Sequence, residues 1–501
     1  MFNKEELFFK RAALIFFICL FTVACFIFTD YGIYWDEGVQ WTQIGALNYN
    51  YIRTGNSAEL LSNFHRYYGP SYEIVLFAAE KLFDLTDARH IFMLRHGICF
   101  LTFFIAVLCF YFLCLKIFKR HALSLLGCLM LVLSPRIFAD SFYNSKDLSM
   151  LCFCIISAYT MYLFIEKQTI FSAFIHALLC GFAVDIRIMA ILLPIATVYF
   201  FFLQKERKII PLLVFIAYSL FFIMAFWPVL WLDPVQNFIE AFKQMSNYPV
   251  KGSTNLYFGQ SVPAADLPWH YIPAWIGITT PVVYSVLFIT GLFFVIKNSF
   301  ASFKSTFMLH SVLFMLFTPV VAIIVLNSSL YDGWRHVFFI YPFFLIIAVY
   351  GFSQVFQIIK NMMIKKLIVV ITVLSMAYTI IVMIGIHPFQ NVYFNVLAGN
   401  NLRQRFEMEY WGLSYKQALE YILAHDKSDQ IHITAANLPG YLNFYCIPAE
   451  DRMRLVKDKD INSGNYFITN FRNHPQDYDI PNSVFQIQVR GEKIMEAFKL
   501  R

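Results

Sequence analysis

The chain has 501 residues, of which 59% are hydrophobic and only 14% are charged. Soluble globular proteins carry about 25% charged residues, so this composition excludes an ordinary soluble chain. The formal net charge is +7. We expect no nucleic-acid partner, because the basic residues stand in short clusters between apolar runs, as in cytoplasmic loops of membrane proteins.

Long apolar runs dominate the first 386 residues. Lipid offers the backbone no hydrogen bonds, so such runs must be helices or closed barrels, and they lack the alternating polarity of barrel strands. We therefore predict an all-α polytopic membrane bundle of about eleven transmembrane helices. The segment 71–83 is short and carries charges, and it is interpreted as an interfacial or re-entrant helix. The candidate spans are residues 12–28, 97–115, 121–139, 148–165, 170–185, 188–203, 209–227, 271–296, 306–326, 336–352 and 366–386.

Basic clusters follow alternate spans, which predicts a cytoplasmic N-terminus and an uncleaved first span. The odd span count then places three large segments on the outer face: residues 29–96, 228–270 and 387–501. The clusters are Lys116, Lys119 and Arg120; Lys205, Arg207 and Lys208; Lys297 and Lys304; and Lys360, Lys365 and Lys366.

The chain divides into a membrane domain, residues 1–386, and a small C-terminal α/β domain, residues 387–501. Ser414 and Gln417 predict a capping box that opens a helix through His425. Residues 431–434 and 466–469 are typical of short strands.

The first outer loop carries the adjacent carboxylates Asp36 and Glu37 after Trp35. A solvated helix cap explains this pair as well as chemistry does, since acidic residues favour helix starts. The turn after the third span is richer in charge, with Arg136, Asn144, Lys146 and Asp147 close together. An interfacial ion-pair cluster is the alternative, although exposed pairs contribute little to stability.

Further cationic residues are predicted on the same outer face. Arg187 lies between the fifth and sixth spans, where it either binds an anion or pairs with Asp185. A lipid phosphate needs such cations, because Arg forks onto its oxygens and Lys supplies a point charge. A nearby carboxylate can deprotonate an attacking hydroxyl, so transfer from a lipid-phosphate donor is the predicted chemistry. The other cationic residues are His65, Arg66, Arg335 and His336.

At this point the sequence resembles the GT-C superfamily of polytopic glycosyltransferases, in particular the bacterial branch related to protein O-mannosyltransferases and lipid A aminoarabinose transferases. The carrying stretches are Trp35-Asp36-Glu37, residues 65–70, residues 144–147, residues 268–271, residues 331–336 and the tail stretch 410–415.

The resemblance implies a polyprenyl-phosphate-sugar donor, a lipid or cell-envelope glycan acceptor, and inversion at the anomeric carbon. By position, Asp36 is the expected general base, Glu37 its support, and Asp147 the acid of the second motif. The relatives that modify proteins carry a β-trefoil insertion, for which residues 228–270 are too short, so a protein acceptor is not favoured. The expected donor-phosphate ligands are Lys146, Arg136, Arg187, Arg335 and His336, and the expected acceptor-side residues are His65, Arg66, Asn144 and Trp35.

The implied location is a bacterial inner membrane, with the active site and the C-terminal domain on the periplasmic side. We expect no cofactor and no metal site, although the paired carboxylates could hold a divalent ion. Three alternatives remain open. They are a transporter or flippase of a lipid-linked or anionic substrate, an accessory scaffold, and a polymer ligase that uses a lipid-linked oligosaccharide.

Overall fold

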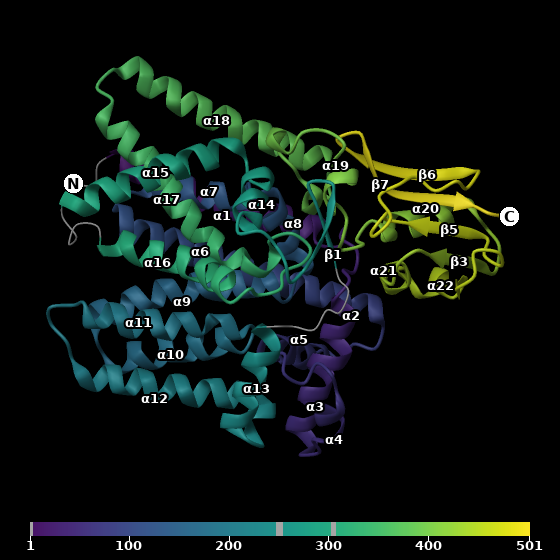
Figure 1. Ribbon diagram of the computed structural model, residues 1–501, viewed down its shortest axis with the longest axis horizontal. Coiled ribbons are helices and arrows are strands. Elements are labelled where there is room, and N and C mark those ends of the chain that lie inside the picture. Colours follow the sequence, from purple (N-terminus) through teal and green to yellow (C-terminus); the bar gives the residue numbers. More distant parts are fainter. Residues whose placement is uncertain (1–3, 247–253, 302–306) are drawn as a thin grey trace.

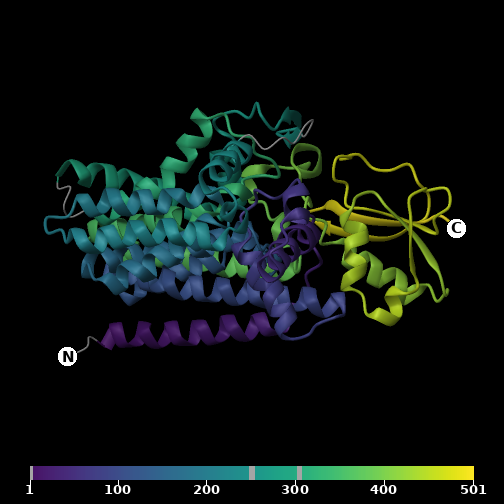
Figure 2. The same ribbon diagram turned by 90° about the horizontal axis from the view of Figure 1, so that it is seen from below.

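The computed structural model describes residues 4–246, 254–301 and 307–501. It is an elongated helical bundle with a small sheet at one end (Figure 1). The N-terminus and the C-terminal sheet lie at opposite ends of the long axis in both views (Figure 2). Residues 247–253 of the second expected outer loop, Lys304 of one basic cluster and residue 306 of one candidate span lie outside the described residues.

The apolar runs form the helices of the bundle, and every predicted span overlaps at least one of them. The bundle consists of α1 (Lys4–Ile27), α6 (Ala88–Phe118), α7 (His121–Val132), α8 (Pro135–Tyr143), α9 (Asp147–Lys167), α10 (Ile170–Val184), η2 (Ile188–Ile191), α11 (Leu192–Phe202), α12 (Ile209–Phe226), α14 (Tyr271–Thr279), α15 (Val282–Ala301), α16 (Phe307–Val325), η4 (Arg335–Ile340), α17 (Tyr341–Ile358) and α18 (Met362–Gly385).

Within the described ranges, seven helices are long and apolar enough to cross a membrane, or eight if the bent pair α7–α8 counts as one span. Three further apolar helices are shorter, over Ile170–Val184, Ile188–Phe202 and Val282–Asn298. The chain is thus an integral membrane protein, and the number of eleven crossings stays a prediction.

Two predicted spans are broken rather than continuous. The span 121–139 bends by 70° between α7 and α8, where Pro135 starts the new helix. The span 271–296 breaks before Val282, next to Pro281. Proline lacks the backbone N–H that an uninterrupted helix needs, which explains both breaks. The stretch 134–147, expected to be a turn, is therefore mostly the buried helix α8.

Contacts between helix ends bring two of the predicted basic clusters to the same end of the bundle. Lys116 at the end of α6 pairs with Glu166 at the end of α9. The amide of His121, at the start of α7, donates to Glu6 of α1 over 3.1 Å. The amide of Lys208, before α12, donates to Gln168 between α9 and α10 over 2.7 Å. These turns lie at the N-terminal end of the bundle, as the alternating basic clusters predicted.

The other end carries the segments expected outside. The first comprises α2 (Glu37–Val39), η1 (Gln40–Gly45), α3 (Ala46–Thr54), α4 (Ala58–Ser62) and α5 (Ser71–Leu82), the last being the expected short helix of 71–83. The second comprises η3 (Pro228–Trp231), α13 (Pro234–Ser246) and the hairpin of β1 (Thr254–Tyr257) and β2 (Gln260–Pro263).

The tail forms the predicted small α/β unit around a five-stranded sheet of order β4-β3-β5-β7-β6. Strand β3 is parallel to β4 and β5, and β7 is antiparallel to β5 and β6. The strands are β3 (Ile431–Ala435), β4 (Leu455–Asp458), β5 (Tyr466–Thr469), β6 (Ser483–Val489) and β7 (Glu492–Lys499). The helical elements are η5 (Gln390–Val392), η6 (Val396–Ala398), α19 (Leu402–Arg405), α20 (Tyr415–His425), α21 (Pro439–Leu442), η7 (Asn443–Cys446) and α22 (Ala449–Arg452).

Helix α20 forms where it was predicted, but the predicted capping box is wrong. The Ser414 side chain donates to Glu409 over 3.0 Å instead of capping the helix. The Gln417 side chain donates to the backbone oxygen of Asp30 over 3.1 Å. Both polar groups are used to join segments far apart in the chain.

The tail is bonded to the first outer segment. Asn443 accepts from the amide of Ile33 and donates to its carbonyl, both over 2.9 Å. A Cβ on Gly32 would lie 2.4 Å from the carbonyl oxygen of Leu413, so only glycine permits this approach. The loop that carries Asp36 is thus fixed against the tail.

Candidate active site

Asp36 lies just after these tail contacts, directly before α2. The amide of Trp35 donates to the carbonyl of Trp411 over 3.0 Å, which holds the backbone beside the carboxylate. The Oδ2 atom of Asp36 lies 3.4 Å from Nη1 of Arg335, and the Asp36 side chain is 32% exposed. Asp36 is thus a carboxylate that is held by an arginine yet open to a second molecule.

Asp147 is buried at the first position of α9 and binds two arginines. Its Oδ2 lies 3.0 Å from Nη1 of Arg335, and its Oδ1 pairs with Arg187. The side chain of Asn144 accepts from the Asp147 amide over 2.8 Å and so fixes the helix start. Arg187 therefore does not pair with Asp185, whose carboxyl oxygens have no hydrogen-bond partner within the described residues.

Two residues of this cluster were not predicted from the sequence. Asp332 binds Nη2 of Arg335 over 3.4 Å and Nη2 of Arg472 over 2.9 Å. Its left-handed backbone, with φ of 57°, precedes Gly333 with φ of 73°, so a tight turn aims the carboxylate between the two arginines. The Asp-Gly pair is a turn signal in the sequence. Nothing near Arg472 in the sequence marks it.

Lys146 and His336 border the same cluster on its cationic side. The Nζ of Lys146 lies 3.4 Å from the ring centre of Tyr68, and no ion pair joins it to a carboxylate of the described residues. Burial, followed by repulsion from Arg187, lowers the pKa of Lys146 well below its usual range. The ring of His336 packs edge-on against Tyr331 at 4.6 Å. An anion beside Lys146 and Arg187 would relieve this repulsion.

Glu37 lies in a second, buried cluster. Only 1% of its side chain is exposed, and it accepts from His96 over 3.3 Å and lies 3.9 Å from Nε of Arg95. Arg95 also pairs with Glu73 and, over 3.1 Å, with Glu80. The structure thus separates the two adjacent acids: Asp36 faces the open cluster and Glu37 faces the protein interior.

The two clusters are joined through Ser145. Its hydroxyl donates to Glu73 and lies 3.1 Å from the hydroxyl of Tyr34. Ser145 directly precedes Lys146, and Tyr34 lies two residues before Asp36. The buried cluster therefore supports both loops that carry the exposed charges.

The remaining predicted residues lie at different distances from this centre. Trp35 stacks under Arg472, whose Cζ is 4.7 Å from the ring centre. His65 packs edge-on against Tyr68 with 5.4 Å between the ring centres, and Lys146 contacts the same tyrosine ring. Arg66 instead binds the carbonyl of Leu61. Arg136 donates to the carbonyl of Tyr393 over 3.0 Å and stacks on Phe394 at 4.6 Å, so it serves a separate contact.

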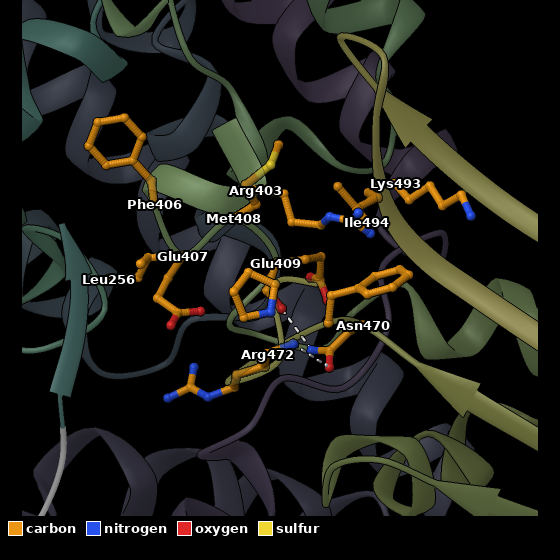
Figure 3. Close-up of a pocket in the computed structure, with 12 residues that line it drawn as sticks. Leu256, Arg403, Phe406, Glu407, Met408, Glu409, Asn470, Arg472, Lys493 and Ile494 are labelled. Atoms are coloured by element: carbon orange, nitrogen blue, oxygen red, sulfur yellow. Dashed lines mark hydrogen bonds between the residues drawn. The ribbon is translucent and has the colours of Figure 1, made fainter. Parts of the chain in front are cut away.

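Cavities adjoin the cluster on the side of the tail. A narrow space of about 10 Å³ lies between the β1 hairpin, α19 and the segment after β5 (Figure 3). It opens beside a polar cleft of about 510 Å³, and both are lined by Leu256, Glu407 and Pro475. In Figure 3 the charged ends of Glu407 and Arg472 extend into the same space.

Two apolar grooves border the residues just before and just after the stretch 331–336. One, of about 230 Å³, reaches from Pro268 to Leu330, and the other, of about 260 Å³, runs between α14, α15, α16 and α17. Both are lined by Ile272, so they follow one another along α14. Among the described residues, no three His, Cys, Asp or Glu side chains are grouped so that they could hold a metal ion.

Comparison with protein families finds a match over part of the chain. Residues 82–232 match the family model described as dolichyl-phosphate-mannose-protein mannosyltransferase. This range includes α8, the start of α9 and Arg187, and it excludes Asp36, Arg335 and the tail. No curated protein matches the chain.

Solved structures of an oligosaccharyltransferase from Archaeoglobus fulgidus are similar to this chain. The apo form has 10% sequence identity and a TM-score of 0.48, and the match covers 90% of this chain and 65% of that one. A complex with an inhibitory peptide and a dolichol-phosphate has 9% identity and a TM-score of 0.48, with 88% and 66% covered. The chain thus spans about two thirds of the length of these proteins.

Proposed function

We propose that this membrane protein belongs to the GT-C superfamily of glycosyltransferases, and that it moves a sugar from a polyprenyl-phosphate-sugar donor to an acceptor hydroxyl. The observation that carries the proposal is the cluster in which Arg335 binds Asp36 and Asp147 together, with Arg187 on the far side of Asp147. It combines one accessible carboxylate with cations that fit a phosphate.

The donor phosphate binds on the cationic side of the cluster. Lys146 and Arg187 repel one another in their buried surroundings, and the singly charged phosphodiester of the donor between them removes that cost. Arg335 and His336 complete this side. The apolar grooves along α14 flank residues 331–336 and suit the polyprenyl chain. Arg136 takes no direct part, because it is bound to Tyr393.

Asp36 acts as the general base. It takes the proton of the acceptor hydroxyl while the hydroxyl oxygen forms a bond to the anomeric carbon. The bond from that carbon to the phosphate oxygen breaks, and the electron pair leaves with the polyprenyl phosphate. Attack opposite to the leaving group inverts the anomeric carbon. Phosphate is a good leaving group, so no strong acid and no cofactor enters the proposal.

Other residues hold this geometry. Asp147 binds Arg187 and Arg335 through its two oxygens and so fixes their spacing. Asn144 in turn fixes the start of α9 at Asp147. Glu37 is assigned to positioning through Arg95 rather than to proton transfer. Trp35, His65 and Arg66 remain acceptor-side candidates. The acceptor is a lipid or a cell-envelope glycan, and the site faces the periplasm of a bacterial inner membrane.

Asp36→Asn tests the base. We expect sugar transfer from synthetic undecaprenyl-phosphate sugars to acceptors in native membranes to fall about 100-fold or more, because the amide cannot take the proton. Binding of undecaprenyl phosphate to the purified protein should stay near the wild-type level. Asp30→Asn is a matched control, since Asp30 pairs with His387 away from the cluster. Full transfer by Asp36→Asn at wild-type abundance would refute the assignment.

A further inference from the structure

The polar cleft beside the β1 hairpin is connected to Asp36 by a continuous line of charged side chains. Glu407 lines both the cleft and the narrow space at its inner end. Next to it, Arg472 binds Asp332 over 2.9 Å, and Asp332 binds Arg335 over 3.4 Å. Arg335 in turn holds Asp36 over 3.4 Å. The cleft is therefore joined to Asp36 through Arg472, Asp332 and Arg335.

The lining of the cleft defines the chemistry of its occupant. Leu256 and Pro475 are its apolar side chains, and the rest of the lining offers hydroxyl, amide and carboxylate groups or glycine backbone. Such groups form many hydrogen bonds in both directions and offer an acyl chain no apolar wall. The lining residues are Thr254, Leu256, Gly259, Ser261, Gln404, Glu407, Asn473, Pro475 and Gln476.

A peptide fits this cleft poorly. An extended peptide adds to a free strand edge, but Tyr257 of β1 already forms a bridge with Phe406. The amide of Gly259 likewise donates to the carbonyl of Arg405 over 3.1 Å. The hairpin is thus paired on the side that borders the cleft, and the lining lacks apolar side-chain pockets for peptide residues.

We infer that this cleft receives the acceptor, and that the acceptor is a saccharide whose hydroxyl groups bind the polar lining between the β1 hairpin, α19 and residues 473–476. This inference rests on the proposed function, because it needs Asp36 to be the base. Glu407, which has no hydrogen bond or ion pair to a described residue, accepts from a saccharide hydroxyl and aligns the next sugar toward Asp36. The donor then binds beside Lys146 and Arg187, and the acceptor binds beside Glu407.

Binding to the full-length protein in nanodiscs tests the inference. The probes are fluorescent neutral oligosaccharides, fluorescent Ser/Thr peptides and a fluorescent diacylglycerol, each titrated by anisotropy. Ser261→Trp fills the cleft, and we expect it to abolish oligosaccharide binding. Glu407→Gln should weaken that binding about fivefold, the usual effect of one lost hydrogen bond. Matched controls are Ser428→Trp and Glu450→Gln, two exposed positions of the tail.

Oligosaccharide binding that Ser261→Trp removes and Ser428→Trp leaves intact supports the inference. It is overturned if oligosaccharides fail to bind the wild type, or if they bind Ser261→Trp equally well. It is also overturned if the wild type binds peptides or diacylglycerol and Ser261→Trp abolishes that binding instead. Binding of undecaprenyl phosphate, measured in the same samples, distinguishes failure of the acceptor inference from failure of the proposed function. That binding should be unchanged in both cleft variants and absent only if the donor assignment is wrong.

Discussion

At the residue scale, the adjacent acids Asp36 and Glu37 show how neighbours in the sequence come to lie in different surroundings. Asp36 is partly exposed and shares Arg335 with Asp147. Glu37 points inward to Arg95 and His96. A carboxylate that accepts a proton must be reachable by the acceptor, and only Asp36 meets that requirement.

Arg335→Ala should weaken binding of undecaprenyl phosphate more than tenfold, because a cation of the phosphate site is lost. Arg335→Lys is the informative partner variant: it keeps the charge but cannot bridge Asp36, Asp147 and Asp332 at once. We expect it to bind donor better than Arg335→Ala and still to transfer sugar slowly. Membrane abundance and donor binding that fall in parallel for both variants would point to a folding role instead.

Glu409 predicts a pH dependence of stability. It is buried, and burial raises its pKa to about 7 despite hydrogen bonds from Ser414 and Leu413. The folded state therefore holds a proton that the unfolded chain releases near its ordinary pKa of 4.5. The contribution of Glu409 to the free energy of unfolding is fully present below pH 4.5. It is lost as the pH rises to the folded-state pKa near 7 and beyond, and the loss is on the order of 3 kcal/mol.

Thermal unfolding of wild type and Glu409→Gln at pH 5 and pH 8 measures this effect. We expect the loss of stability between the two pH values to be smaller in the variant, whatever its absolute stability, because glutamine does not ionise. Equal losses in both proteins would assign the pH dependence to other groups.

At the element scale, helices α15 and α17 show how the bundle is held without a hydrophobic driving force between helices. A Cβ on Gly291 would lie 1.9 Å from the carbonyl oxygen of Ile347, and one on Gly351 would lie 2.2 Å from that of Leu287. Close approach of small residues is a usual way to associate helices in lipid. These contacts lie within α17, which directly follows η4 and Arg335 in the chain.

Gly351→Val should therefore lower the thermal stability of the purified protein by about 2 kcal/mol or more, since the backbones must separate. Gly97→Ala is the matched control, because a Cβ there meets nothing within 4 Å. In a helix, that control should be neutral or stabilising by up to about 1 kcal/mol. A stable Gly351→Val protein with normal donor binding would show that α15 and α17 can repack.

At the scale of the whole molecule, the two ends of the bundle differ in chemistry. Basic turns occupy the N-terminal end, and the carboxylate–arginine cluster occupies the end beside the tail. Transporters place ionisable residues near the middle of the bilayer, which this arrangement does not favour.

The orientation in the membrane is testable with reporter fusions. A reporter fused after Lys366, at the start of α18, should be cytoplasmic, and one fused after Gly399 should be on the outer side. Both reporters on the same side would contradict the crossing of α18 and with it the eleven-span prediction.

The sequence by itself determined that the chain is a helical membrane protein. It also determined that the charged motifs lie at the end of the bundle opposite to the basic turns. Apolar runs can satisfy their backbone only as helices in lipid, and basic turns sort by side, so local pattern is sufficient for both. The motifs at Asp36, Asp147 and Arg335 were likewise visible, as was the outline of the tail domain.

Only the tertiary structure decided which charges meet. Arg187 binds Asp147 rather than its neighbour Asp185, and Arg472 reaches Asp332 from the tail domain. Ser414 likewise gives up a helix cap to bind Glu409. These side chains take the partners that the packing of distant segments brings to them, because a buried polar group without a partner is costly. Asp185, which receives no such partner among the described residues, shows that local neighbours alone do not decide the pairing.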